Sequence, residues 1–285
     1  MKISFQDKIL IEDGALVVFF NDKLSLLFPE TDQKKIIEKI FKKAIKSVNF
    51  KSNKTNLIDL IAPSNINYNR LIFLNLGDID SKSEYDWIKI GGKIMSFSLN
   101  NNINKINIIF EYTKTVAFLV KIPSLIVYGS QLRDYSFLKY KTSSNFKNNY
   151  IKSLCFQTTH ANTSDRAYNE LKHILAGVNL ARDLVNEPSN VLFPEAFTKR
   201  IESIKEFKLK ISTLSRKKIE KEGMGGILAV SRGSPFEPNV CVIEYNGGKK
   251  NEKPIGLVGK GVTFDTGGIS IKPSPRMEEM KFDMC

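Results

Sequence analysis

Short apolar runs alternate with amphipathic segments through the first half of the chain, and this alternation constrains the fold most strongly. The run "ALVVFF" (Ala15–Phe20) has the length of a buried strand, and residues 31–48 then place apolar side chains on one helical face. The same reasoning predicts strands at 56–62, 70–77, 105–110 and Ser153–Gln157, and a helix at 84–98. Strands that alternate with helices indicate a largely parallel, doubly wound α/β sheet.

A long helical pattern separates this first unit from the rest of the chain. The polar stretch 158–165 is predicted to be a linker or cap, and six apolar residues between Leu171 and Val185 then share one face. The pattern ends at "NEPSN" (186–190), because Pro188 cannot continue a helix. A helix of this length between two α/β units is predicted to connect them.

The remaining residues predict the beginning of a second α/β unit. Its expected elements are helices at 194–207 and 215–222, and strands at 209–213, 223–234, 239–247 and 254–259. The predicted organisation is therefore an N-terminal α/β domain (1–160), a connecting helix and junction (161–190), and an incomplete C-terminal α/β domain (191–285).

Composition excludes several classes of protein. No apolar run approaches the length of a membrane span, so no membrane partner is expected. Three widely spaced cysteines predict no disulfide framework and fit a reducing compartment, and two histidines exclude a His-rich metal site. The net charge of +13 suggests weak DNA contact as a secondary property, but 35 of the 43 basic residues are lysine and they are spread along the chain.

The closing stretch, "VGKGVTFDTGGISIKPSPRMEEMKFDMC", concentrates charged residues around glycine turns. Ligands of open α/β sheets bind just past the carboxyl ends of strands, and Lys260 stands at the end of the strand predicted at 254–259. Asp265 and Lys272 follow in a loop, and Asp283 lies near the end of a helix expected to start with Ser274 as its N-cap. These four charged groups are therefore expected to converge on one pocket.

Such a group suits divalent cations, which prefer carboxylate oxygen ligands. Two cations can hold an attacking water and the scissile group, and a lysine that stays charged can stabilise an oxyanion. From spacing alone, a phosphate-cradling loop and a tight turn with solvated lysines stay open as alternatives, although neither GxGxxG nor GxxxxGK[ST] is present.

Three segments resemble the leucyl (cytosol) aminopeptidase family of di-metal peptidases. "LVGKGVTFDTGGISIKPSPRMEEMKFDM" is similar to the family signature, "RDLVNEPSNVLFPEAF" to its domain junction, and "GMGGILAVSRGS" to its next strand and glycine turn. The resemblance implies a macro-like N-terminal sheet domain, a di-metal peptidase domain and two divalent ions, Mn²⁺ or Zn²⁺. It also implies peptide substrates with a leucine-like first residue, a cytoplasmic location and a homohexamer.

The resemblance also assigns roles to residues at matching positions. Lys260 and Asp283 match ligands of one metal, and Asp265 matches an aspartate that contacts both metals and lies in the substrate site. Lys272 matches the catalytic lysine that binds the substrate carbonyl and stabilises the tetrahedral intermediate.

The resemblance also implies a segment "NTDAEGR", which would supply further metal ligands and an arginine that positions a bicarbonate acting as general base. This segment does not occur in this sequence. We therefore interpret the sequence as a truncated gene product or fragment, and expect weak metal binding, exposed apolar faces and no turnover by these residues alone. Two alternatives stay open: a non-catalytic product whose N-terminal domain binds nucleic acid, as the resemblance allows, and a poorly folded remnant.

Overall fold

The computed structural model describes residues 1–8, 13–48, 57–112, 120–142, 150–204, 209–249 and 251–284, with side chains described as far as residue 282. The chain divides into two compact units, Met1–Asn179 and Leu180–Cys285. The domain boundaries predicted at 160 and 190 stay predictions. Each unit is described by itself below.

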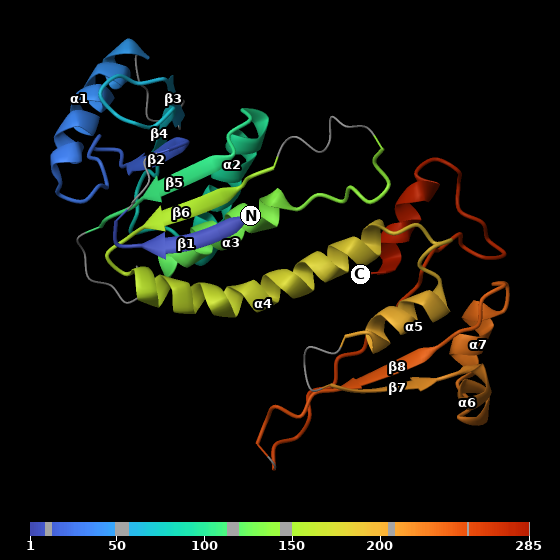
Figure 1. Ribbon diagram of the computed structural model, residues 1–285. Coiled ribbons are helices and arrows are strands. Elements are labelled where there is room, and N and C mark those ends of the chain that lie inside the picture. The colour runs from blue at the N-terminus through green and yellow to red at the C-terminus, as the bar shows by residue number, and fades with distance from the viewer. Residues whose placement is uncertain are drawn as a thin grey trace. The chain divides into compact units, whose positions relative to one another are not determined.

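The first unit is built on a six-stranded sheet, shown in Figure 1. Its strands are β1 (Lys2–Gln6), β2 (Ala15–Phe20), β3 (Leu57–Ile61), β4 (Arg70–Asn75), β5 (Lys105–Ile109) and β6 (Ser153–Gln157). The spatial order is β1-β6-β5-β2-β4-β3, and all neighbours are parallel except β3, which runs antiparallel to β4. The largely parallel sheet predicted from the alternating pattern is confirmed.

Helices cover both faces of this sheet, which explains why the central strand is apolar throughout. On β2, Val17 and Phe19 belong to one apolar cluster with α2 (Glu84–Asn100) and α3 (Ile122–Asp134). The alternate residues Val18 and Phe20 belong to a second cluster with α1 (Asp32–Ser47). Since both faces are buried, all six residues of β2 are buried and the strand reads as a continuous apolar run.

Two glycines allow α2 and α3 to approach each other closely. A side-chain carbon at Gly91 would lie 2.8 Å from the Ile126 carbonyl carbon and from the Ser130 nitrogen. A side-chain carbon at Gly129 would lie 2.7 Å from the Ile88 carbonyl carbon. Any larger residue at either position would therefore force the two helices apart.

The sequence prediction omitted β1 and α3 and misplaced one boundary in the first unit. β1 is a short edge strand, whereas α3 is a buried helix whose apolar residues do not keep to one face. The stretch 158–165 is only partly a linker, because α4 (Ala161–Asn186) already begins at Ala161. The end of α4 just before Pro188 is as predicted.

The second unit contains α5 (Pro194–Glu202), β7 (Lys210–Leu214), α6 (Arg216–Lys221) and β8 (Val240–Glu244), all at predicted places. β7 and β8 form a two-stranded antiparallel sheet. α5 packs against both strands: Thr213 donates a hydrogen bond of 2.7 Å to Glu202, and the Cys241 sulfur lies 3.6 Å from the Thr198 hydroxyl oxygen. These contacts hold α5 against β7 and β8.

Two of the four strands predicted for the second unit are wrong. The stretch 223–234 forms the helix α7 (Gly225–Ser231), because the short run "ILAV" fits either a strand or a helix and Gly223, with a φ of +65°, ends the turn before it. Residues 254–259 form no strand, because they pair with no neighbouring strand among the described residues. Their apolar side chains are exposed instead: Leu257 is 93% and Val258 103% exposed.

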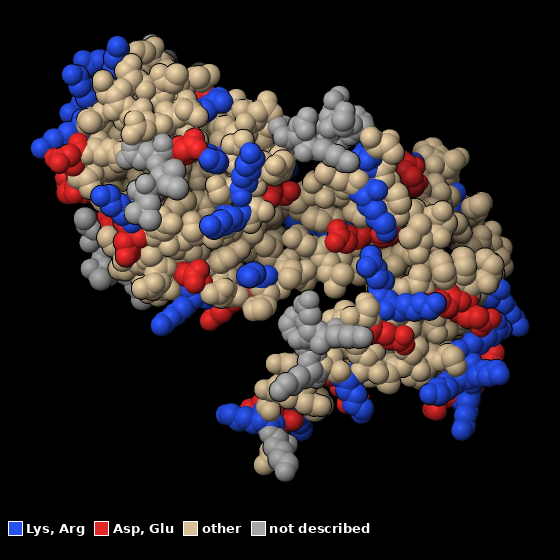
Figure 2. Space-filling view, in the orientation of Figure 1, with Lys and Arg blue, Asp and Glu red and all other residues tan. Residues whose placement is uncertain are grey.

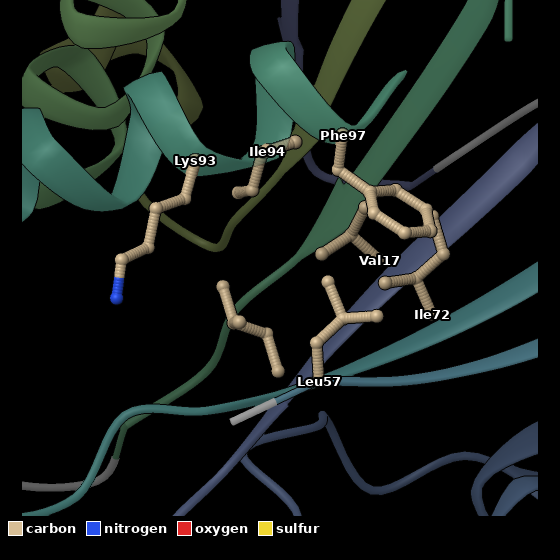
Figure 3. A pocket seen from close by; sticks show the side chains of 7 residues that line it. Val17, Leu57, Ile72, Lys93, Ile94 and Phe97 are labelled. Carbon is tan, nitrogen blue, oxygen red and sulfur yellow. The ribbon is translucent and has the colours of Figure 1, made fainter. Parts of the chain in front are cut away.

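An apolar hollow lies in the first unit between the sheet and α2. Figure 3 shows Val17, Leu57 and Ile72 pointing into it from the strands, with Phe97 and Ile94 above them on α2. Lys93 supplies the one charged group of its lining. The hollow is lined by apolar side chains and offers no set of groups for catalysis.

Candidate functional site

The candidate site lies in the loop between Lys260 and the closing 3₁₀-helix η3 (Met277–Met284). At its start the loop runs beside α5, since a side-chain carbon on Gly261 would lie 3.1 Å from the Phe197 ring. Gly267 and Gly268 adopt φ values of +90° and +66°, a region that glycine enters without strain. The glycine pair therefore permits the sharp turn that the sequence predicts after Asp265.

The turn brings Asp265 and Lys272 together. The Lys272 amine donates a hydrogen bond of 2.9 Å to Asp265 Oδ2, and the Gly267 N–H donates one of 2.9 Å to Asp265 Oδ1. The backbone closes the same loop, because the Lys272 N–H donates to the Thr266 carbonyl at 2.8 Å. Both side chains stay partly open to solvent, with 42% of Asp265 and 36% of Lys272 exposed.

The surroundings of Asp265 favour its ionised form. The hydrogen bond from Lys272 lowers the pKa of the Asp265 carboxyl group most, and the Gly267 N–H lowers it further. The charges of Lys272 and, to a smaller extent, Lys260 also lower this pKa. The contacts with Lys272 and Gly267 therefore favour Asp265 as an anion.

The structure brings together some of the predicted site residues and leaves one undescribed. Asp265 and Lys272 are in direct contact, and Lys260 acts on Asp265 through its charge. Asp283 lies in η3, but its side chain is outside the described residues, so its predicted approach to the site stays a prediction. Its helix differs from the expected one, because it begins at Met277 as a 3₁₀-helix after a turn at Ser274.

Sequence reasoning missed one contact of the catalytic candidate. Met280 of η3 places its sulfur 3.0 Å from the Lys272 amine. In the sequence "MEEM", Met280 follows Met277 by one helical turn. No sequence pattern, however, indicates that a thioether contacts a lysine.

The donor types at the site fit divalent cations. Asp265 supplies an ionised carboxylate, the group that hard cations prefer, and Lys260 supplies an amine nearby that could ligate when neutral. Within the side chains that the structure describes, no three His, Cys, Asp or Glu residues gather as a metal cluster. A complete set of metal ligands would therefore require Asp283 or other groups in addition to Asp265 and Lys260.

These observations define an α/β protein in two units, whose second unit holds an ionised carboxylate in direct contact with a lysine. Comparison with protein families matches residues 16–144 to the N-terminal domain of the cytosol aminopeptidase family, and residues 179–285 to its catalytic domain. The chain belongs to the cytosol aminopeptidase family.

Bacterial relatives resemble almost the whole chain. A protein named probable cytosol aminopeptidase from Rhodopseudomonas palustris is 36% identical over 273 residues, which cover 95% of this chain and 54% of that protein. One of the same name from Afipia carboxidovorans is 34% identical and covers 100% of this chain and 57% of its own length. The chain thus spans about half the length of the curated relatives it matches.

Solved structures support the fold. A tomato leucine aminopeptidase mutant superposes with a TM-score of 0.78 at 21% identity, over 100% of this chain and 56% of that one. The bottromycin maturation enzyme BotP in complex with Mn superposes with a TM-score of 0.73 at 22% identity, over 95% of this chain and 53% of that one. In the described part of the chain, no helix has the length and apolar character needed to cross a membrane.

Proposed function

We propose that this chain carries part of the active site of a metallo-aminopeptidase that releases leucine-like N-terminal residues from peptides. The observation that carries the proposal is the Lys272 amine held 2.9 Å from the Asp265 carboxylate, in a chain of the cytosol aminopeptidase family. The family name, cytosol aminopeptidase, supports a cytoplasmic location. A homohexamer, as in the family, is part of the same proposal.

Three residues would hold metal in this proposal. Lys260 and Asp283 would ligate one of two divalent cations, and Asp265 would contact both of them. Mn²⁺ and Zn²⁺ both suit this mixture of nitrogen and oxygen donors. When bound, such cations supply Lewis acidity and lower the pKa of a coordinated water.

Lys272 would act on the substrate. Its ammonium group carries three N–H donors, of which one is given to Asp265. A charged donor fixed in this way stabilises the negative charge that develops on a carbonyl oxygen as a tetrahedral intermediate forms. Asp265 would therefore both bind metal and orient the catalytic lysine.

Two variants separate these roles. Asp265→Asn should abolish both Mn²⁺ binding and the release of leucine from a chromogenic leucyl amide, because it removes the carboxylate charge. Lys272→Ala should spare Mn²⁺ binding, measured by titration calorimetry, and lower turnover by about 100-fold or more, the usual loss when an oxyanion donor is removed. Lys253→Ala, at an exposed lysine outside the loop, is the matched control and should change neither quantity.

The assay should use this chain and any longer product of the same gene. If a product that includes an "NTDAEGR"-type segment binds Mn²⁺ but releases no leucine, the proposed activity is refuted. Equal loss of Mn²⁺ binding in Asp265→Asn and Lys272→Ala would contradict the division of roles.

A second candidate function is nucleic-acid binding by the first unit. Helix α1 buries Ile37, Phe41 and Ala44 against the sheet and directs a basic face to solvent. Figure 2 shows Lys and Arg side chains over the part of the surface that α1 occupies. The exposed lysines of that face are Lys35, Lys39, Lys42, Lys43 and Lys46.

Duplex DNA retention by the chain should then fall steeply as salt rises from about 50 to 200 mM, since each phosphate contact releases counterions. Retention that is absent at low salt, or that Lys39→Glu and Lys43→Glu together leave unchanged, would exclude this candidate.

A further inference from the structure

The loop that follows β8 contains the only Asn–Gly pair of the sequence, Asn246–Gly247. Both residues are exposed. Within the described part of the chain, no hydrogen bond holds the Asn246 side chain or the Gly247 N–H. We propose that Asn246 is a self-modification site, at which the chain converts asparagine to aspartate and isoaspartate without an enzyme. The inference does not depend on the proposed function.

The reaction requires only the chain, hydroxide and water. The Gly247 nitrogen loses its proton to hydroxide and attacks the side-chain carbonyl carbon of Asn246. A carbon–nitrogen bond forms, the amide nitrogen leaves as ammonia, and the product is a succinimide ring. Water then opens the ring at either carbonyl and gives aspartate or isoaspartate. Both products add a negative charge, and isoaspartate also inserts a methylene into the main chain between β8 and residues 254–259.

Glycine at position 247 favours this attack, and the structure shows that the fold leaves room for little else there. Glycine has no side chain to obstruct its nitrogen, and it reaches backbone angles that other residues resist. A side-chain carbon on Gly247 would lie 2.5 Å from Tyr245 Cζ and 2.7 Å from the Tyr245 hydroxyl oxygen. Since Tyr245 is 71% exposed, its ring can turn away, so Gly247→Ala is expected to fold.

The fold treats the related pair Asp13–Gly14 differently. The Asp13 carboxylate forms an ion pair with Lys105 and accepts a hydrogen bond from the Gly14 N–H. Gly14 is also packed closely against Lys105, because a side-chain carbon there would lie 2.6 Å from Lys105 Cβ. Both reacting groups of this pair are therefore engaged, and the folded chain should form isoaspartate at position 246 and not at position 13.

The test is incubation of the purified chain in mildly alkaline buffer. Isoaspartate is measured by enzymatic methylation with labelled S-adenosylmethionine and is located by peptide mass spectrometry, while ammonia release is followed in parallel. The parent chain should accumulate isoaspartate at position 246, faster as the pH rises. Asn246→Gln should abolish this signal. Gly247→Ala should slow its accumulation about tenfold, which corresponds to a barrier about 1.4 kcal/mol higher.

Two positions in the same molecules serve as controls. Asn65 is exposed but precedes the branched residue Ile66, so its peptide should stay unmodified. Asp13 should form isoaspartate only when urea unfolds the chain, because unfolding releases its carboxylate from Lys105. Absence of isoaspartate at position 246 in the parent chain, or equal rates in the parent chain and Gly247→Ala, would overturn the proposal. Equal isoaspartate at Asp13 in the folded and unfolded chain would refute the protection given by the fold.

Discussion

The close packing of α2 against α3 makes Gly91→Ala a sharp test of how the first unit is held together. The new methyl group would lie 2.8 Å from the Ile126 carbonyl carbon and from the Ser130 nitrogen, and closer still to the Ile126 oxygen. Ordinary contact is near 3.5 Å, so the helices must separate by about 0.7 Å or more. Overpacking of this kind costs about 1–3 kcal/mol.

Two smaller effects also contribute to the net change in the free energy of unfolding. Separation would stretch the 3.1 Å contact from the Ser130 hydroxyl to the Gly91 carbonyl. The loss is less than about 1 kcal/mol, because the same hydroxyl also donates to the Ile126 carbonyl at 2.9 Å. Replacing glycine by alanine inside a helix gains about 1 kcal/mol in return. Gly91→Ala should therefore lower the free energy of unfolding by about 2 kcal/mol. Gly92→Ala is the matched control: its methyl would lie 3.9 Å from the Gly129 oxygen, so only the helix-forming gain should appear.

Urea unfolding followed by tryptophan fluorescence measures this difference in the free energy of unfolding, because the tryptophan lies in the first structural unit. The chain has one tryptophan, Trp87, which is fully buried on α2. With about 2 kcal/mol per M for the dependence on urea, the midpoint of Gly91→Ala should fall by about 1 M, and that of Gly92→Ala should stay or rise slightly. Equal midpoints for the two variants would refute the close approach of α2 and α3.

Three further predictions follow from single contacts. Ser83→Ala should lower the stability of the first unit by about 1 kcal/mol in the same assay, because it removes the capping box at the start of α2. Partial burial raises the pKa of the Cys155 thiol, so iodoacetamide should modify Cys155 more slowly than Cys241. The rate at Cys155 should still rise with pH above about 9, and faster modification of Cys155 than of Cys241 would contradict this prediction. Ile219→Ala, at a fully buried site of the second unit, should cost about 2–4 kcal/mol and increase protease cleavage there, whereas Ile255→Ala, at a side chain 90% exposed, should have no effect.

The sequence predicted the first unit well because its local pattern and its tertiary contacts agree. The run Ala15–Phe20 is buried on both faces and pairs with β4 and β5, so an apolar run of strand length corresponds to one structure only. β3 was also predicted, but no sequence pattern indicated that it pairs antiparallel to β4 at the edge of the sheet.

The second unit was predicted less well because its apolar runs are short and weakly buried. In α7 the run Ile227–Val230 lies in a seven-residue helix with no buried residue, and nothing in its spacing separates helix from strand. Residues 254–259 have a strand composition, but composition predicts a strand only where a partner strand is present, and the described residues provide none. The apolar side chains of Ile255, Leu257 and Val258 are exposed, but they lie outside any strand, so the exposed sheet faces expected for this unit stay a prediction.

In the candidate site, some residues are positioned by contacts within one turn, and others depend on distant parts of the chain. Asp265 and Lys272 are seven residues apart, and the bonds that hold them together come from Thr266 and Gly267 within the same turn. Spacing and glycine content alone could therefore predict this pair. Lys260 instead follows the exposed segment 254–259, so its position depends on how that segment is paired, which a local pattern does not specify. The contact between Asp265 and the proposed catalytic lysine is thus formed within one loop, whereas the geometry of a metal site that includes Lys260 requires the surrounding sheet.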